Sequence, residues 1–268
     1  MVISLEKYDL KFKKRYGQNF LKDVNVVKRI VDVVKDKDNS LVIEVGPGGG
    51  ILTRELATSF NNVLCYEIDE SLKDELNSRI GEFDNIQVIY KDFLTCDIGK
   101  DIEDYKYDNL YFISNVPYYI TSPIILKLID SNALFNKIIM MVQKEVGDRF
   151  SSDYGSKEYG AISVILQYYF DIKKEFVVSK GNFVPVPKVD SVIVSFTPKD
   201  RTNKCNDETK FRTLVNNSFQ FKRKTIKNNL FNYDLDIVNS VLEKHGYNLN
   251  SRAEEIDIET FIDLSNSL

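Results

Sequence analysis

The alternation of short β-branched runs with helical patterns constrains the fold of this chain more than any other feature. Across residues 41–142, apolar runs of four or five residues alternate with stretches whose apolar residues have helical spacing. Strands that alternate with helices form parallel βαβ units, so we predict an α/β fold with a doubly wound, mostly parallel sheet. The expected strands are 41–45, 63–66, 86–90, 110–113 and 138–142, and the expected helices are 52–59, 70–80 and 123–130.

The remainder of the chain divides into two parts. Residues 191–196 form a further apolar run, which we expect to close the sheet, while 161–178 fit a strand or a helix and are left open. After Pro198 only helical patterns remain, and they imply a small all-α domain. We predict domains at 1–198 and 199–268 with a polar linker at 197–207. The helices of the second domain are expected at 209–218, 223–231, 236–244 and 258–266.

Length and composition exclude several classes of protein. The 268 residues can bury a full core, and 43% apolar with 28% charged residues is typical of soluble globular proteins. No apolar run approaches the roughly 18 residues of a membrane span, and the basic N-terminal residues are not followed by the apolar region of a secretory signal. Cys65, Cys96 and Cys205 are scattered, which indicates neither a zinc site nor a disulfide framework. We expect a cytoplasmic monomer without a metal.

The single histidine limits the chemistry. His245 stands before Gly246 near an expected helix end, where a surface or capping role suits it. Catalysis by this chain would therefore proceed without a histidine base or triad.

Charge is distributed unevenly, although the net charge is only −4. Residues 199–229 contain nine Lys or Arg against three acids, and 232–268 contain two against eight. One face of the helical domain could thus be basic and bind phosphates while the whole chain stays acidic. A solvated helix of mixed charge would give the same counts.

A glycine-rich turn follows the first expected strand. Gly46-Pro47-Gly48-Gly49-Gly50 precedes a helix, and its glycines permit positive φ and close approach of backbone N–H groups to a ligand. Glu67 ends the next strand about twenty residues on, where a carboxylate accepts ribose hydroxyls. Ile51 stands where a dinucleotide fingerprint has glycine. The pattern instead resembles the S-adenosylmethionine-binding turn of class I methyltransferases.

Asp92 follows the third expected strand at the same edge of the sheet. Its carboxylate could accept a hydrogen bond from the adenine amino group of the cofactor. An aspartate after a strand is more often a turn or cap residue, but Gly46 and Glu67 beside it favour the binding role.

Asn115-Val116-Pro117-Tyr118 ends the fourth expected strand, where doubly wound sheets bind ligands. The exocyclic amine of adenine is a poor nucleophile because its lone pair is delocalised into the ring. A side-chain amide oxygen and a backbone carbonyl can each accept one of its hydrogens and direct the lone pair at a methyl donor. Pro117 fixes φ, and Tyr118 offers a ring for an unpaired base. These residue types predict methylation of an adenine amine by alignment, without a strong base.

With these motifs, the chain resembles the ribosomal RNA adenine N6-dimethyltransferases over nearly its whole length. Gly17-Gln18-Asn19-Phe20-Leu21, Tyr159-Gly160 and residues 183–191 also match the pattern of that family. The resemblance implies a class I methyltransferase fold with a seven-stranded sheet and S-adenosylmethionine as cofactor. It implies that Phe183 covers the target adenine opposite Tyr118, and that the cofactor contacts Asn19, Leu21, Gly46, Glu67, Asp92 and Asn115.

Two subfamilies are possible. Residues 115–124, 219–230 and 252–255 resemble the small-subunit enzymes of the KsgA type, which implies dimethylation of two adjacent adenines and a link to ribosome biogenesis. The alternative is the Erm type, which modifies large-subunit RNA and confers macrolide resistance. Val116 departs from the more frequent leucine but keeps its backbone carbonyl. The acidic net charge bears on RNA affinity and leaves the chemistry unaffected.

The expected partner is ribosomal RNA or a precursor of the small subunit. We predict that Lys222, Arg223, Lys224 and Lys227, at the start of a helical segment, contact RNA phosphates, as does a second cluster at Lys11, Lys13, Lys14 and Arg15. Two other functions remain open: a non-catalytic RNA-binding assembly factor, and a DNA adenine or protein amine methyltransferase. The intact tetrapeptide argues against the first, and the match at 219–230 against the second.

Overall fold

The computed structural model describes residues 20–200 and 204–268, and the chain divides into two compact units. Unit 1 comprises Met1–Gly147 and Lys173–Thr197, and unit 2 comprises Asp148–Ile172 and Pro198–Leu268. The chain passes from unit 1 to unit 2 between Thr197 and Pro198, one residue from the domain boundary at 198/199 that the sequence predicts. The segment Asp148–Ile172 groups with the C-terminal helices instead of with the residues around it in sequence.

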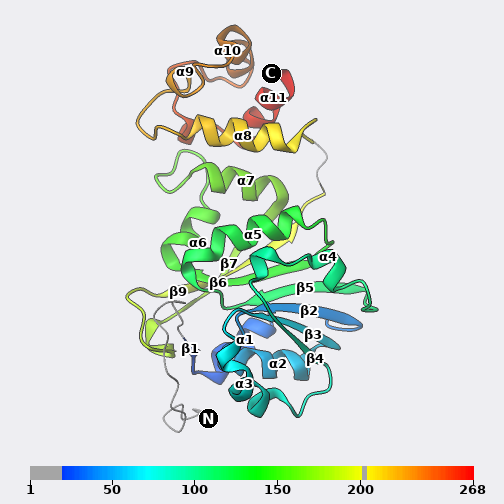
Figure 1. Cartoon of the computed structure of the whole chain (residues 1–268). Helices are drawn as coiled ribbons and strands as arrows, with labels where there is room; N and C mark the ends of the chain where they lie inside the picture. Colours follow the sequence, from blue (N-terminus) through cyan, green and yellow to red (C-terminus); the bar gives the residue numbers. More distant parts are fainter. Residues whose placement is uncertain (1–19, 201–203) are drawn as a thin grey trace. The chain divides into compact units, whose positions relative to one another are not determined.

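Unit 1 is built on a seven-stranded sheet of order β4-β3-β2-β5-β6-β9-β7 (Figure 1). The neighbours from β4 through β6 are parallel, and β9 runs antiparallel to β6. The predicted doubly wound, mostly parallel α/β fold is therefore confirmed. The strands are β2 (Ser40–Val45), β3 (Asn62–Glu67), β4 (Ile86–Tyr90), β5 (Asn109–Ser114), β6 (Lys137–Gln143), β7 (Phe170–Val178) and β9 (Ser191–Pro198).

At the end of the sheet, the sequence leaves 161–178 open and predicts the place of the last strand wrongly. Residues 161–178 form a helix, α7 (Ala161–Tyr169), which passes directly into β7. The strand expected to close the sheet, β9, lies between β6 and β7, so that expectation is wrong and β7 is the edge strand. Because an edge strand is half open to water, it tolerates the charged residues Lys173, Lys174 and Glu175.

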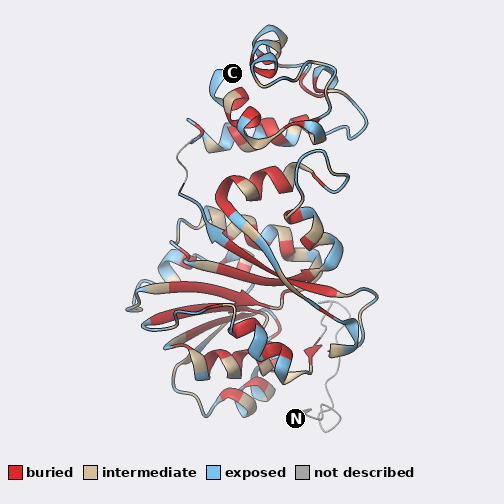
Figure 2. Ribbon diagram, turned by 180° about the vertical axis from the view of Figure 1, so that it is seen from behind, coloured by how far each residue is buried: buried red, intermediate tan, exposed pale blue. Residues whose placement is uncertain are grey.

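Helices cover both faces of the sheet. In Figure 1, α1, α2 and α3 lie below it, and α4 and α5 lie above it. Apolar side chains of α1 and α2 pack on the central strands in one buried cluster, and β2, β3, β5, β6 and β9 are the most uniformly buried strands (Figure 2). The helices are α1 (Val24–Val31), α2 (Ile51–Ser59), α3 (Lys73–Ile80), α4 (Ile98–Asp101), α5 (Thr121–Asp130) and α6 (Lys144–Phe150).

Short elements complete the chain. A two-stranded antiparallel sheet pairs β1 (Phe20–Leu21) with β8 (Phe183–Val184), and it places Leu21 opposite Phe183. Single turns of 3-10 helix follow several strand ends. These are η3 (Glu70–Leu72), η4 (Phe93–Thr95), η5 (Tyr118–Ile120) and η6 (Lys180–Asn182), while η7 (Ala253–Glu255) lies between α10 and α11.

Unit 2 is helical around an aromatic and aliphatic core. Helix α8 (Glu208–Ser218) packs on α7 and on α11 (Ile258–Ser267), which also packs on α10 (Leu235–Lys244). Phe211 and Phe261 are fully buried at these contacts. Three of the four predicted helices are thus confirmed. His245 is the C-cap residue of α10, as its position before Gly246 predicts, and it also hydrogen-bonds Asp263 at 2.8 Å.

The helix predicted at 223–231 is wrong in extent. Helix α9 spans only Ile226–Asn229, and Lys222, Arg223 and Lys224 lie in a turn before it. The reason is tertiary, because Thr225 pairs with Arg252 and the Asn229 side chain accepts the Phe221 N–H. Both contacts favour a turn over another helical turn.

No helix among residues 20–200 and 204–268 is long and apolar enough to cross a membrane. In the same residues, no three His, Cys, Asp or Glu side chains gather as metal ligands would.

Candidate active site

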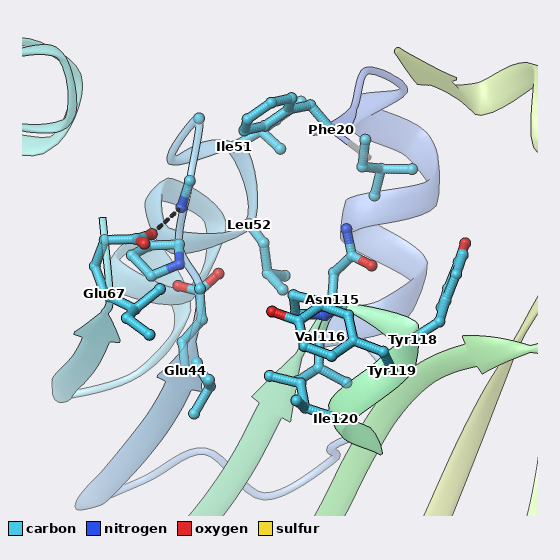
Figure 3. A pocket seen from close by; sticks show the side chains of 18 of the residues that line it. Phe20, Glu44, Ile51, Leu52, Glu67, Asn115, Val116, Tyr118, Tyr119 and Ile120 are labelled. Atoms are coloured by element: carbon cyan, nitrogen blue, oxygen red, sulfur yellow. Dashed lines mark hydrogen bonds between the residues drawn. The ribbon is translucent and has the colours of Figure 1, made fainter. Parts of the chain in front are cut away.

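A cavity opens at the carboxyl ends of the parallel strands in unit 1 (Figure 3). In doubly wound sheets this edge is where ligands bind, because successive loops converge there. The structure brings most of the sequence-predicted site residues to this one cavity. Its lining includes Leu21, Gly46, Glu67, Asp92, Asn115, Pro117 and Tyr118.

The glycine-rich turn that begins at Gly46 has two functional halves. Gly46 and Gly48 have φ of 72° and 50°, a region that side chains disfavour, and no atom lies within 4 Å of a Cβ built on Gly46. A Cβ on Gly50 would instead lie 3.2 Å from the side chains of Leu76 and Ile80 in α3. Gly46 thus leaves open space, whereas a Cβ on Gly48 would lie 2.8 Å from the Phe20 ring, and Gly50 permits close packing of α3.

Arg79 fastens α3 to this turn, and sequence reasoning missed it. Its guanidinium donates to the Gly49 carbonyl at 2.7 Å and pairs with Glu75 at 2.5 Å. In return, Arg54 of α2 donates to the backbone carbonyl of Arg79. An arginine inside a helix has no sequence signature for such a contact, which joins residues thirty positions apart.

Glu67 ends β3 with a buried carboxylate. Its oxygens accept the backbone N–H groups of Gly48 at 3.2 Å and Asp69 at 2.9 Å. Burial raises the pKa of Glu67, and the two backbone hydrogen bonds oppose that rise. A carboxylate has about four acceptor positions, so two remain for the hydroxyls of a ligand.

Glu44 is a second buried carboxyl group in the lining, and its place in the sequence predicts only a strand residue. It lies beside the labelled Glu67 in Figure 3, and its carboxyl accepts the Cys65 thiol at 3.6 Å. Burial raises the pKa of Glu44 to about 8, and the charge of Glu67 adds to the effect. The raised pKa favours the neutral acid form of Glu44 at pH 7.

Asp92 is exposed at the rim of the cavity. Its side chain accepts the Leu94 N–H at 2.9 Å and so caps η4. The capping role and the ligand role weighed from the sequence are compatible, because a carboxylate accepts several hydrogen bonds.

Asn115 is held next to the glycine-rich turn by the residue before it. The hydroxyl of Ser114 donates to the Val45 carbonyl at 2.6 Å and accepts the Val45 N–H at 3.3 Å. The backbone pairing of β2 with β5 ends just before this bridge. The bridge therefore joins the two strands at the residues directly before Gly46 and Asn115. The half-buried Asn115 amide points into the cavity in Figure 3.

The tyrosine of the tetrapeptide is fixed through its hydroxyl. The Tyr118 and Ser191 hydroxyls are 2.8 Å apart, and Ser191 is fully buried on β9. Burial raises the pKa of Tyr118, which keeps its hydroxyl protonated at neutral pH. The following residue, Tyr119, is 61% exposed at the cavity and presents a second ring there.

One of the described residues that the sequence predicts for the site does not line the cavity. Phe183 is fully buried in the core cluster beside Leu21, so a contact with a target adenine would require it to move. Its role stays a prediction. Asn19 and the basic cluster at Lys11, Lys13, Lys14 and Arg15 lie outside the described residues.

The residues that the sequence predicts to contact RNA belong to unit 2. Lys222, Arg223, Lys224 and Lys227 are all exposed. They lie on and after the turn that precedes α9.

The cavity fits the expected cofactor. Gly46 leaves its backbone open, Glu67 and Asp92 provide acceptors for hydroxyl and amino groups, and the 48% exposed Ile68 supplies an apolar wall for a flat ring. A site of apolar walls with a few placed polar groups is typical of nucleoside ligands.

Comparison with known proteins gives consistent results. The sequence profile of the family described as Ribosomal RNA adenine dimethylase matches residues 9–268. Proteins named Ribosomal RNA small subunit methyltransferase A are similar over almost their whole length. The one from Macrococcus caseolyticus is 39% identical over 98% of this chain and 92% of its own, and the one from Mycoplasma mycoides is 42% identical over 96% and 97%.

Solved structures show the same likeness. The 23S rRNA methyltransferase ErmE superposes with a TM-score of 0.72 at 27% identity, over 93% of this chain and 99% of its own. A dimethyladenosine transferase from Plasmodium falciparum superposes with a TM-score of 0.75 at 25% identity, over 91% and 95%.

Proposed function

Since this chain belongs to the ribosomal RNA adenine dimethylase family, we propose that its substrate is adenine in the RNA of the small ribosomal subunit. The chain is an rRNA adenine methyltransferase that uses S-adenosylmethionine. Its curated relatives at 39% and 42% identity are named small-subunit enzymes, whereas ErmE, a 23S enzyme, is 27% identical. We therefore favour the KsgA type over the Erm type.

One observation carries the catalytic proposal: the Asn115 tetrapeptide and the Gly46–Glu67 side of the site line the same cavity. A methyl donor and an acceptor amine that bind there would be held close together, and alignment of two reactants can account for much of the barrier reduction. A protein that only binds RNA needs no amide acceptor at that edge of the sheet.

Each site residue has a proposed task. Glu67 accepts the ribose hydroxyls, Asp92 accepts the cofactor's adenine amino group, and Gly46 and Leu21 contact the cofactor with Asn19. Bound S-adenosylmethionine supplies an electrophilic methyl group.

On the substrate side, the Asn115 side-chain oxygen and the carbonyl of Val116, which Pro117 orients, accept the two N6 hydrogens of the target adenine. The nitrogen lone pair then faces the methyl group. Tyr118 stacks on the adenine, and Phe183 covers its other face after moving from the core. No side chain has to remove a proton beforehand, because the amine becomes acidic only when it has been methylated.

The remaining functional assignments concern the partner. We assign RNA binding to the helical domain at 199–268, with phosphate contacts at Lys222, Arg223, Lys224 and Lys227. The substrate is a small-subunit precursor in the cytoplasm, the protein acts as a monomer, and two adjacent adenines are dimethylated. The acidic balance at 232–268 would keep RNA to the face that carries the lysines.

Transfer of tritium from labelled S-adenosylmethionine tests this proposal. Small-subunit particles that lack the methyl groups should accept label at N6 of adenine, and large-subunit particles should not. Label in large-subunit RNA instead would identify an Erm-type enzyme. Binding of S-adenosylmethionine without any transfer to either particle would support the assembly factor.

A further inference from the structure

The turn before α9 is built to hold an apolar ring in water. The side chain of Asn229, only 5% exposed, accepts the Phe221 N–H at 2.9 Å and donates to the carbonyls of Phe221 and Lys224, each at 3.4 Å. The Lys224 N–H donates to the Phe221 carbonyl at 2.8 Å and closes the turn. Hydrogen bonds to a buried side-chain amide fix a backbone, so residues 221–224 form a defined turn.

The chain after the turn is anchored as well. The Ile226 N–H donates to the Ser251 carbonyl at 2.8 Å, and the Lys227 N–H donates to the Leu249 carbonyl at 3.1 Å. The 221–224 turn is thereby held at both of its ends within unit 2.

The turn exposes a large apolar ring beside three cations. Phe221 is 48% exposed although it is a large apolar side chain, and Lys222, Arg223 and Lys224 beside it are exposed too (Figure 2, where the connection from α8 to α9 is pale blue). Three consecutive cations with one aromatic ring are the two elements of a single-strand nucleic-acid site: charge for phosphates and a flat face for a base.

We propose that Phe221 stacks on an unpaired base of the RNA while Lys222, Arg223 and Lys224 contact the adjoining phosphates. The inference rests on the proposed function and adds the kind of RNA that unit 2 selects, namely single-stranded RNA. A duplex keeps its bases stacked on each other, so no base is available to stack on the Phe221 ring. The cations alone would bind duplex and single strand without distinction.

Binding of full-length protein to a fluorescent single-stranded oligoadenylate and to an RNA duplex of equal length tests the proposal, with each measured across a salt series. Phe221→Ala should weaken binding of the single strand roughly 5- to 150-fold, the effect of losing one base stack. The slope of log affinity against log salt should not change, because no phosphate contact is lost. Duplex binding should stay as in the wild type, and Phe221→Trp should restore single-strand binding.

Phe231→Ala is the matched control, since Phe231 is 63% exposed in the same unit but lies outside the 221–224 turn. It should leave single-strand binding unchanged. Wild-type single-strand affinity in Phe221→Ala would overturn the proposal, and so would equal losses for duplex and single strand or an equal loss in Phe231→Ala. If Phe221→Ala binds the oligomer normally and loses affinity only for small-subunit particles, the ring contacts a protein and the proposal is wrong.

The outcome is separable from that of the proposed function. Oligomer binding requires no methyl transfer, and the tritium assay with the wild-type protein requires no stack at Phe221. Unfolding temperature and S-adenosylmethionine binding of each variant show whether it is folded.

Discussion

The cavity of unit 1 and the 221–224 turn of unit 2 are built in opposite ways. In the cavity, the Glu67 carboxylate is buried and is oriented by the backbone N–H groups of Gly48 and Asp69. On the turn, the polar groups are exposed side chains, and only the backbone beneath them is fixed, by Asn229. Buried polar groups must be satisfied and are therefore rigid, whereas exposed cations are mobile and screened by salt.

The two regions therefore control different properties, namely the rate of the reaction and the affinity for RNA. Chemistry needs atoms held to fractions of an ångström, which buried and hydrogen-bonded groups provide. Capture of a large, charged partner needs long-range attraction and tolerance of different shapes, which exposed lysines provide. Substitutions in the cavity should therefore change rate or cofactor affinity by large factors, and substitutions on the turn should change RNA affinity by smaller, salt-dependent ones.

Asn115→Ala should have the largest effect. Loss of the amide that accepts an adenine hydrogen should lower methyl transfer on the order of 1,000-fold, the upper range for removal of one preorganised polar group. Single-turnover transfer from labelled S-adenosylmethionine measures it. Asn115→Asp, which keeps an acceptor oxygen, should retain more activity, and a near-wild-type rate in the alanine variant would refute the role assigned to Asn115.

Glu44→Gln should change the pH dependence of stability. The folded pKa of about 8 lies above the ordinary value of 4.5, so the folded state keeps a proton that the unfolded state loses. Stability should therefore fall by a few kcal/mol as pH rises from 4.5 to 8 and then level off, since each pKa unit corresponds to about 1.4 kcal/mol. Urea unfolding of the Gln variant should show a flatter profile there. The exposed Glu70→Gln should keep the wild-type profile; equal slopes in all three proteins would mean that Glu44 is ionised when folded.

Arg79→Met should weaken cofactor binding about tenfold, because a hydrogen bond to a charged group contributes roughly 1.5 kcal/mol and this one fixes the glycine-rich turn. Calorimetric titration with S-adenosylhomocysteine measures the change. Glu75→Gln removes the ion pair but leaves the Arg79 contact to Gly49, so its effect should be smaller. If the two variants bind equally well, the turn does not depend on Arg79.

Lys222→Ala and Arg223→Ala should have the smallest effects at moderate salt. Each loses one phosphate contact, so the slope of log affinity against log salt should fall by about 0.7 for single strands or 0.9 for duplex RNA. Cofactor affinity should not change, because the substitutions leave unit 1 intact. An unchanged slope in the double variant would exclude the turn as a phosphate-binding surface.

Local patterns in the sequence predict a large part of this molecule. The alternation of strands and helices predicts the sheet, and three of the four predicted C-terminal helices occur as expected. The failures have nonlocal causes. The helix expected at 223–231 is shortened by contacts with Arg252 and by the Asn229 side chain, and β9 enters the sheet beside β6 although its sequence says nothing of its neighbour.

The same distinction between local and nonlocal causes applies to the site. Local patterns predict which residues stand at the carboxyl ends of the strands. A strand's end, a glycine-rich turn and an Asn-x-Pro-Tyr segment can each be recognised from neighbouring residues alone. Only the tertiary structure decided that Glu44 is buried and neutral, that Ser114 bridges to Val45 and that Arg79 holds Gly49. It also decided that Phe221 is displayed on the 221–224 turn. These properties depend on desolvation and on contacts between residues distant in sequence, which no local spacing encodes.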